Sequence, residues 1–284
     1  MDLFMKKYLV SIALLSLLVS ACNIQKCIYE IDYEYGIFLG ASKDDIHKIE
    51  KYHNVCIDID EFESSDISYL NNKNINVYAY LSIGSLETYR DYYEEFKDYC
   101  FYDYENWPDE KWIDISQESW KEHLYREARR FKNLGAIGLF MDNFDVYYIA
   151  SEEYEGDKVN AEEIYTSCIE ILNRLFTLDL SLIINSGSTL LERINEENPS
   201  LLDKIDCYTQ ECVFSNIKDY DHDIFTVQDK DTRDYYQSVI SFMKEHSDIL
   251  LLEYTKDYKV IDKIVKYCHS FNYHYYISKT VDLK

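Results

Sequence analysis

The sequence predicts an α/β fold, a single (β/α)8 TIM barrel preceded by a lipoprotein signal peptide. Short apolar runs alternate with amphipathic helical patterns, the order expected of parallel strands joined by helices. The 284 residues suffice for one large domain, and no Pro/Gly/Ser-rich linker divides them after the N-terminus. Acidic side chains directly follow several apolar runs. A doubly wound open sheet is the alternative that this alternation permits.

The N-terminal segment has the pattern of a bacterial lipoprotein signal. Lys6 and Lys7 precede an apolar stretch at 8–19 that is shorter than a transmembrane helix, and Cys22 follows two small residues. We therefore expect lipidation at Cys22 and a protein lipid-anchored to a bacterial membrane, at the cell surface or in the periplasm. An ordinary secretory signal and an uncleaved anchor are the alternatives. The expected parts are a lipoprotein signal peptide (1–21), a lipidated tether (22–34) and the barrel domain (35–284).

Each later apolar run predicts a strand covered on both faces, because such a strand cannot alternate apolar with polar residues. The eight predicted strands are 36–39, 55–59, 77–83, 137–141, 180–184, 205–208, 249–252 and 273–277. Between them, Ser42 is expected to cap a helix over 44–52, and Gly135 to end one that contains Trp120 and Leu134. Apolar stripes predict further helices around 164–175, 239–243 and 261–268.

Composition excludes several classes of function. The net charge of -24 argues against nucleic acid as a partner and suits a neutral or cationic one, such as an amino sugar. The seven cysteines other than Cys22 lack metal-site spacing, so no metal is predicted and several are expected to be buried. No glycine-rich phosphate-binding motif follows a strand, and no cofactor is predicted.

Polar side chains gather where the predicted strands end, and the C-terminal ends of barrel strands meet at one mouth. The candidates are Asp58 and Asp60 after the second strand, Glu87, Tyr89 and Arg90 after the third, Asp142, Asn143 and Asp145 after the fourth, Asn185 after the fifth, Glu211 after the sixth, and Glu253 and Tyr254 after the seventh.

Many carboxylates with few His or Cys residues favour acid/base chemistry on a sugar. A glycosidase needs one carboxyl group to protonate the leaving oxygen and another to attack or to activate water. Aromatic side chains near the mouth are expected to stack on sugar rings, namely Tyr89, Trp107, Tyr147 and Tyr208.

Each candidate also has a structural alternative. Asp142 could cap the next helix, and Glu211 could be a solvated loop acid. Asp58 fits a ligand contact or a turn equally well. Arg90 either pairs with Glu87 and fixes the mouth or covers the surface.

Three segments of the chain form a recognisable set. They are Val77-Tyr-Ala-Tyr-Leu-Ser-Ile-Gly-Ser-Leu-Glu-Thr-Tyr-Arg90, then Trp112-Ile-Asp-Ile115 with Trp120, then Gly138-Leu-Phe-Met-Asp-Asn-Phe-Asp-Val-Tyr147. Together they resemble glycoside hydrolase family 114, with the similarity spanning roughly residues 35–280. The resemblance implies a TIM-barrel catalytic domain with endo-α-1,4-polygalactosaminidase-like activity on a polysaccharide.

By this resemblance Asp142 and Glu211 match the family's proposed catalytic pair, with Asp142 as nucleophile and Glu211 as general acid/base. The expected substrate-binding residues are Asp58, Glu87, Tyr89, Arg90, Asn143, Asp145, Asn185, Glu253 and Tyr254. The family usually has Gly-Glu-x-Glu where this chain has Gly84-Ser-Leu-Glu87, so Ser85 stands in place of an acid. Two other hypotheses therefore stay open: a non-catalytic glycan-binding surface lipoprotein on the same scaffold, and a structural surface protein with no sugar site.

Overall fold

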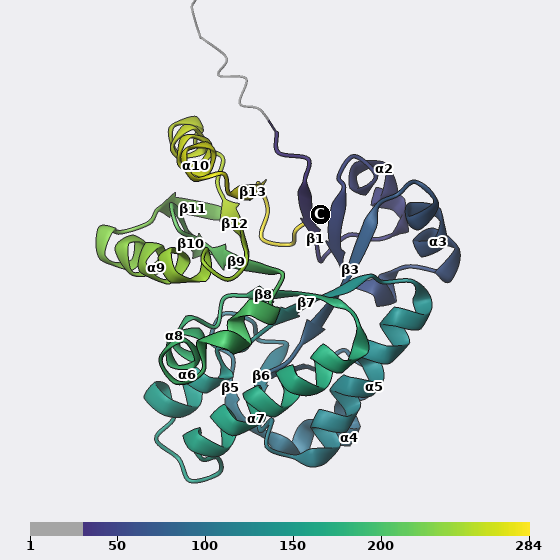
Figure 1. The fold of residues 1–284 in the computed structure, drawn as a ribbon, viewed down its shortest axis with the longest axis vertical. Coiled ribbons are helices and arrows are strands. Elements are labelled where there is room, and N and C mark those ends of the chain that lie inside the picture. The colour runs from purple at the N-terminus through teal and green to yellow at the C-terminus, as the bar shows by residue number, and fades with distance from the viewer. Residues whose placement is uncertain (1–30) are drawn as a thin grey trace, which may run out of the picture. The chain divides into compact units, whose positions relative to one another are not determined.

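Eight parallel strands form a nearly closed barrel at the centre of the fold (Figure 1). The computed structural model describes residues 31–284, so the expected signal peptide and Cys22 lie outside the described residues. The barrel strands are, in spatial order, β1 (Tyr35–Phe38), β2 (Asn54–Ile57), β3 (Asn76–Ser82), β7 (Gly138–Asp142), β8 (Ser181–Asn185), β9 (Cys207–Glu211), β12 (Asp248–Tyr254) and β13 (His274–Ser278). All eight predicted strands are present, and the barrel prediction is confirmed over the open-sheet alternative.

Helices surround the strands, as a (β/α)8 barrel requires (Figure 1). They are α2 (Ile46–Ile49), α3 (Ser64–Asn72), α4 (Tyr93–Phe96), α5 (Glu118–Leu134), α6 (Val146–Tyr148), α7 (Ala161–Leu175), α8 (Ser188–Glu197), α9 (Lys230–Met243) and α10 (Tyr258–Phe271). Two predicted helix ends, at Ser42 and at Gly135, are confirmed. Ser42 and Asp45 form a capping box, and Gly135 ends α5 with φ of 106°, in the left-handed region that favours glycine.

Burial explains why the strands are apolar throughout. All four residues of β1 and of β2 are buried, and so are six of the seven in β3 and in β12. Helices cover their outer side, and the barrel interior is filled by side chains, so neither face meets water. Cys56, Cys168, Cys207 and Cys268 are buried among these residues as free thiols, which confirms the prediction of buried cysteines.

The strand order begins at β1 and ends at β13, and side chains fill the seam between these two strands. Phe38 of β1 lies edge-on to Tyr276 of β13, with ring centroids 5.4 Å apart. Asp32 Oδ2 lies 3.1 Å from His274 Nδ1 and so ties the chain before β1 to β13. Aromatic packing and an ion pair thus complete the barrel at the seam.

Two small sheets interrupt the barrel pattern, and the sequence did not predict them. A three-stranded antiparallel sheet of β4 (Ser85–Glu87), β6 (Glu110–Ile113) and β5 (Cys100–Asp103) lies between β3 and α5 in the chain. A hairpin of β10 (Ser215–Asp219) and β11 (Ile224–Val227) follows β9. Both insertions follow the C-terminal ends of barrel strands, so they add walls to the mouth.

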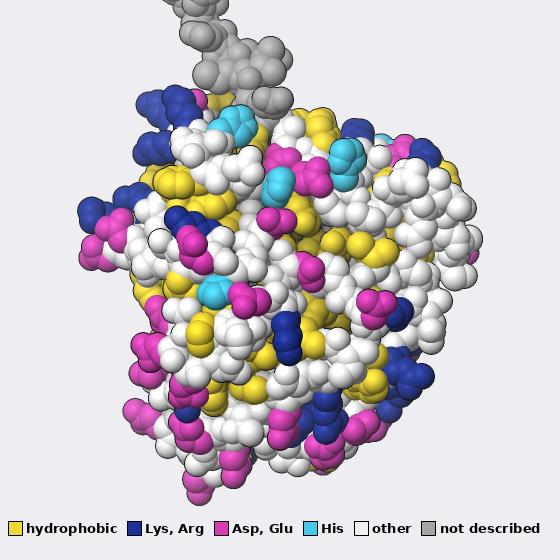
Figure 2. Space-filling model, viewed as in Figure 1, with side chains coloured by type: hydrophobic (Ala, Val, Ile, Leu, Met, Phe, Trp, Pro, Cys, Tyr) yellow, Lys and Arg dark blue, Asp and Glu magenta, His cyan; other side chains and the backbone are white. Residues whose placement is uncertain are grey.

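The outer surface carries much of the chain's acidity. Figure 2 shows Asp and Glu side chains spread over one face, with Lys and Arg scattered among them. Within residues 31–284, no helix has the length and apolar character needed to cross a membrane.

Candidate active site

Three neighbouring strands end in polar side chains that meet inside the barrel mouth. Asp142, Asn185 and Glu211 are the last residues of β7, β8 and β9, which are adjacent in the sheet. The Nδ2 of Asn185 donates hydrogen bonds to Asp142 Oδ1 at 2.9 Å and to Glu211 Oε1 at 2.7 Å. Two carboxyl groups that are distant in the chain therefore share one amide. The distance between Asp142 Oδ1 and Glu211 Oε1 cannot exceed the combined length of these two hydrogen bonds.

The backbone turns sharply directly after each of these three residues. Asn143, Ser186 and Cys212 have φ of 64°, 57° and 56°, in the left-handed region. Such backbone costs on the order of 1–3 kcal/mol for residues other than glycine, and it is concentrated at functional sites. A Cβ on Gly84 would lie 2.1 Å from the carbonyl oxygen of Asn143, so only glycine lets the loop after β3 approach this turn.

Burial dominates the electrostatics of Asp142. It raises the pKa of the carboxyl group to about 6, while hydrogen bonds from Asn185, from the Asn143 amide and from Tyr80 hold the rise in check. The Asn143 N–H lies 2.8 Å from Asp142 Oδ1. Asp142 does not cap α6, whose N-cap position is Asp145, without a side-chain hydrogen bond.

The pKa of Glu211 is higher than that of Asp142, for two reasons. Burial, followed by the nearby charge of Asp142, raises its pKa to about 7, against hydrogen bonds from Asn185 and Tyr254. Asp145 behaves in the same way: burial and Asp142 raise its pKa to about 7, and its Oδ2 accepts from the Gly187 N–H at 3.2 Å. The mouth therefore holds several carboxyl groups whose protonation changes near neutral pH, a common property of catalytic sites.

These groups line a cavity of about 740 Å³, which is within the usual range for ligand sites. Acidic side chains dominate the charged part of its lining: Asp58, Glu61, Glu87, Asp109, Glu110, Asp142, Asp145, Glu211 and Asp282. Among the described residues, Lys284 supplies the basic side chain in the lining, and its Nζ pairs with Asp282 at 2.8 Å. Such a cavity favours neutral or cationic ligands over anions.

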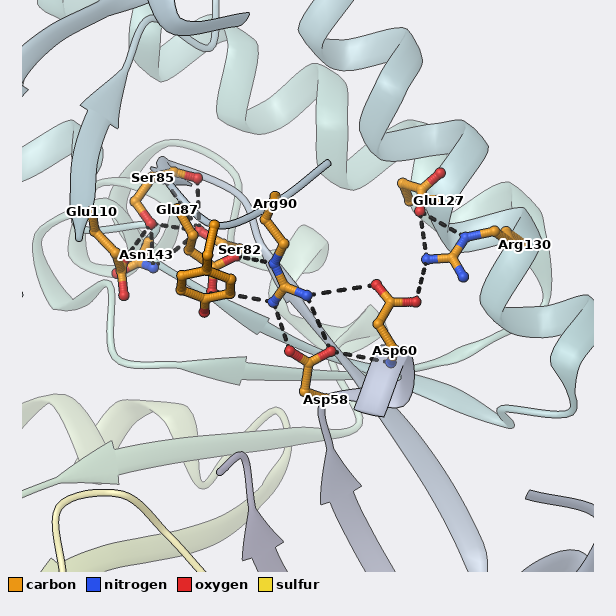
Figure 3. A network of polar contacts seen from close by, with 11 residues as sticks. Asp58, Asp60, Ser82, Ser85, Glu87, Arg90, Glu110, Glu127, Arg130 and Asn143 are labelled. Carbon is orange, nitrogen blue, oxygen red and sulfur yellow. Dashed lines mark hydrogen bonds and ion pairs between the residues drawn. The ribbon is translucent and has the colours of Figure 1, made fainter. Parts of the chain in front are cut away.

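One side of the cavity is neutralised from behind by Arg90 (Figure 3). Its guanidinium group lies 2.5 Å from Glu87 Oε2 and 2.8 Å from Asp58 Oδ2. A third contact, at 3.5 Å, reaches Asp60, which also pairs with Arg130 of α5 at 2.8 Å. Arg90 thus pairs with Glu87, the first of the two alternatives predicted for it, and does not simply cover the surface.

A second cluster links the loop after β3 to β6 and β7 (Figure 3). Asn143 Nδ2 donates to the hydroxyls of Ser82 and Ser85, both at 3.0 Å, and Ser85 Oγ donates to Glu110 Oε2 at 2.6 Å. Tyr104 donates to Asn143 Oδ1 at 3.2 Å. Asn143 is therefore saturated by protein partners and acts as a link between strands.

The structure brings most of the expected site residues to the cavity: Asp58, Glu87, Tyr89, Asn143, Asp145, Asn185 and Tyr254 line it together with Asp142 and Glu211. Asp58 also accepts from the Asp60 N–H at 3.2 Å, so it caps a turn as well. Trp107 lines the cavity, as predicted for a stacking aromatic.

Four residues that were expected to contact substrate do not line the cavity. Arg90 lies behind the lining, where it pairs with carboxylates. Glu253 is fully buried and accepts from the backbone N–H groups of Phe214 and Ser215, both at 2.9 Å, so it anchors the segment after β9. Tyr147 and Tyr208 are buried away from the cavity because helix and barrel packing enclose their rings.

Three residues of the site were not predicted from the sequence. Tyr80 lies on β3 and bonds to Asp142. Tyr104 and Glu110 come from the inserted sheet region, whose antiparallel pairing had no signal in the barrel pattern. The alternation of Tyr78 and Tyr80 within an apolar strand was the one available clue for Tyr80. Within residues 31–284, His, Cys, Asp and Glu do not form a group that could hold a metal ion.

Similar folds occur in solved structures of glycosidases. The glycoside hydrolase domain of PelA from Pseudomonas aeruginosa matches with a TM-score of 0.72 and 18% identity, over 88% of this chain and 96% of that one. Ega3 from Aspergillus fumigatus, in complex with galactosamine, matches with a TM-score of 0.69 and 18% identity, over 91% of this chain and 95% of that one. The α-galactosidase TtGalA from Thermus thermophilus matches with a TM-score of 0.56 and 11% identity, over 87% of this chain and 58% of that one. At these identities the likeness shows the fold alone.

No curated protein matches the sequence. The model of glycoside-hydrolase family GH114 matches residues 28–283, which is nearly the whole described chain. This match agrees with the barrel, with the acidic mouth and with the three sequence segments that resemble the family. The chain therefore belongs to glycoside-hydrolase family GH114 and is a glycosidase.

Proposed function

We propose that this glycosidase cleaves α-1,4-linked, galactosamine-containing polysaccharide by a retaining two-carboxylate mechanism. The observation that carries the mechanism is the Asn185 amide shared by Asp142 and Glu211. Retaining glycosidases hold their two carboxyl groups about 5–5.5 Å apart, whereas inverting ones need about 6.5–9.5 Å. Hydrogen bonds of 2.9 and 2.7 Å to one nitrogen keep the two bonded oxygens below the inverting range.

The different surroundings of the two groups support their roles. Asp142 accepts three hydrogen bonds and has the lower pKa, so it is the group that is ionised and able to attack the anomeric carbon. Glu211, with the higher pKa, donates its proton to the glycosidic oxygen as that bond breaks. In the second step Glu211 takes a proton from water, whose oxygen displaces Asp142 from the sugar.

The choice of substrate rests on charge. Among residues 31–284, Asp142, Asp145 and Glu211 have no Lys or Arg within ion-pair distance. A sugar carrying ammonium groups would supply the missing positive charge in this cavity. Ega3, which shares the fold, has been solved with galactosamine.

We also propose that Cys22 is lipidated and that the protein is held at the outer face of a bacterial membrane. The support is the sequence of residues 1–22, which has the charged, apolar and small-residue order of a lipoprotein signal. Mass spectrometry of the mature N-terminus tests this: a diacylglyceryl group on Cys22 is expected. An unmodified N-terminus at another residue would contradict it.

The test of the enzymatic proposal is a product assay on deacetylated and N-acetylated α-1,4-galactosaminan, with NMR of the first anomer released. Shortened, amine-bearing products that appear first as the α-anomer are expected. Release of the β-anomer first would show inversion and overturn the retaining assignment. Binding of the oligomers without any shortening would favour the non-catalytic glycan-binding alternative.

A further inference from the structure

The structure contains a cavity carboxyl group that the reaction described above does not use. Glu110 begins β6 and lines the same cavity as Asp142 and Glu211. It is held through its Oε2 by the hydroxyl of Ser85 at 2.6 Å. Ser85 in turn contacts Asn143, the neighbour of Asp142, so Glu110 is joined to the reacting pair through two side chains.

Glu110 has no ion-pair partner within residues 31–284, and Arg90 acts on it only from a distance. It lies directly opposite Glu87 in the antiparallel pairing of β4 with β6, and like charges in that arrangement are destabilising. Arg90 pairs with Glu87 and with Asp58, but no Lys, Arg or His among residues 31–284 forms an ion pair with Glu110. Burial, together with Glu87 and Asp142, raises the pKa of Glu110 to about 8, against the hydrogen bond from Ser85 and the charge of Arg90. Glu110 is therefore largely protonated at neutral pH in the empty cavity, and a bound cation would favour its ionised form. The protein thus leaves the second glutamate of a facing pair without a cation.

We propose that Glu110 binds the protonated amino group of a hexosamine unit in the cavity and thereby selects free-amine units over N-acetylated ones. This inference rests on the proposed function, because it assigns a binding residue to the same site. The Ser85 hydroxyl fixes Oε2, while Oε1 remains available to accept a hydrogen bond from the ligand. An ammonium group supplies both the donor and the missing positive charge, whereas an acetamide group is neutral and larger.

Binding measured without turnover tests this proposal separately from hydrolysis. The host is the full chain carrying Asp142→Asn, and the ligands are galactosamine and N-acetylgalactosamine oligomers of equal length, compared by calorimetry. Adding Glu110→Gln should weaken binding of the free-amine oligomer by about tenfold or more, the effect of losing a charge-assisted hydrogen bond. Affinity for the N-acetylated oligomer should change by less than about threefold, since a neutral acetamide gains little from the charge.

The glutamine variant preserves the local geometry, because its side-chain oxygen can still accept from Ser85. Glu105→Gln is the matched control: it removes the same charge from an exposed position near β6 that does not line the cavity, and it should leave both affinities unchanged. Ser85→Ala gives a second, independent variant. This variant keeps the carboxyl group of Glu110 but removes the hydrogen bond that holds it in place. We therefore expect a smaller loss of affinity, confined to the free-amine oligomer.

The outcomes separate this proposal from the enzymatic one. If Glu110→Gln or Ser85→Ala binds both oligomers as the host does, or if the host does not prefer the free amine, the assignment of Glu110 is overturned. Hydrolysis by the wild-type chain would still stand in that case. Conversely, a selective loss of free-amine binding would support Glu110 even if the wild-type chain cleaved neither polymer.

Discussion

Two groups of carboxylates face the same cavity and differ in what lies beside them. Asp58 and Glu87, on the side of β2 and β4, share the guanidinium group of Arg90. Asp142 and Glu211, at the ends of β7 and β9, share only the neutral amide of Asn185. An opposite charge stabilises a buried carboxylate more strongly than a hydrogen bond from a neutral amide does.

The difference separates a structural cluster from a reactive one. Paired with Arg90, the first group is fixed in place and shapes the cavity wall. Without a cation, the second group titrates near neutral pH, as an acid and a nucleophile must. Residues of the same type, facing the same cavity, therefore serve different purposes because of one arginine.

The sharpest test of this comparison is removal of the reactive carboxyl groups. Asp142→Asn and Glu211→Gln should each lower kcat/KM by about 10³-fold or more, because each removes a group that reacts directly. Steady-state kinetics on the galactosamine polymer measures the loss. The exposed Asp157→Asn and Glu155→Gln are matched controls and should keep wild-type rates. Substantial activity in Asp142→Asn would remove the proposed nucleophile.

Removal of the cation should damage the fold. Arg90→Met leaves the buried Asp58 and Glu87 without their shared cation, so we expect the free energy of unfolding to fall by about 3–5 kcal/mol. Urea denaturation followed by circular dichroism measures this change. Arg129→Met, at an exposed position of α5, should have little effect. A loss below about 1 kcal/mol, the range of a surface pair, would show that Arg90 is not a structural link.

The reactive cluster should make the protein less stable as pH rises. The pKa of Asp142 is raised on folding from 3.8 to about 6, so its stabilising contribution is complete below pH 3.8 and is lost as pH rises through 6. Relative to wild type, Asp142→Asn should therefore gain about 2–3 kcal/mol of stability between pH 4.5 and pH 8. Urea titrations at the two pH values measure it, with Asp157→Asn as reference. An equal difference at both pH values would contradict the raised pKa.

The same pKa values predict a narrow pH optimum. Activity requires Asp142 ionised and Glu211 protonated, and their pKa values are about 6 and about 7. kcat/KM should fall about tenfold per pH unit below the first value and above the second. A pH–rate profile on a substrate without ammonium groups isolates these two residues. Activity that stays constant up to pH 9 would argue against Glu211 as the acid.

The smallest effect is expected at the outer end of the Arg90 network. Asp60 is 36% exposed and lies 3.5 Å from Arg90, and it pairs at 2.8 Å with the partly exposed Arg130. Asp60→Asn should therefore cost less than about 1 kcal/mol of stability. Comparing this loss with that of Arg90→Met shows which ion pairs of the Arg90 network are buried and which are exposed to solvent. A loss as large as that of Arg90→Met would make the whole chain of ion pairs one cooperative unit.

Several features could be predicted from the sequence because their physical signals are local. An apolar run such as residues 137–141 predicts a strand covered on both sides, and Gly135 predicts the end of the helix before it. Because parallel barrel strands end at one mouth, Asp142 and Glu211 could be expected to share it. Glu253, Tyr147 and Tyr208 were expected to contact substrate but do not line the cavity, because sequence position does not tell which way a side chain points.

The sequence by itself determined the order of the eight barrel strands and the excess of carboxylates at their ends, since periodicity and residue type suffice for both. Only the tertiary structure decided which carboxylates meet a cation. Arg90 reaches Asp58 from the loop after β4, Asn185 bridges two strands, and Glu110 enters the cavity from an inserted sheet. The environment of a charge depends on neighbours within a few ångströms in space, and these come from segments far apart in the chain.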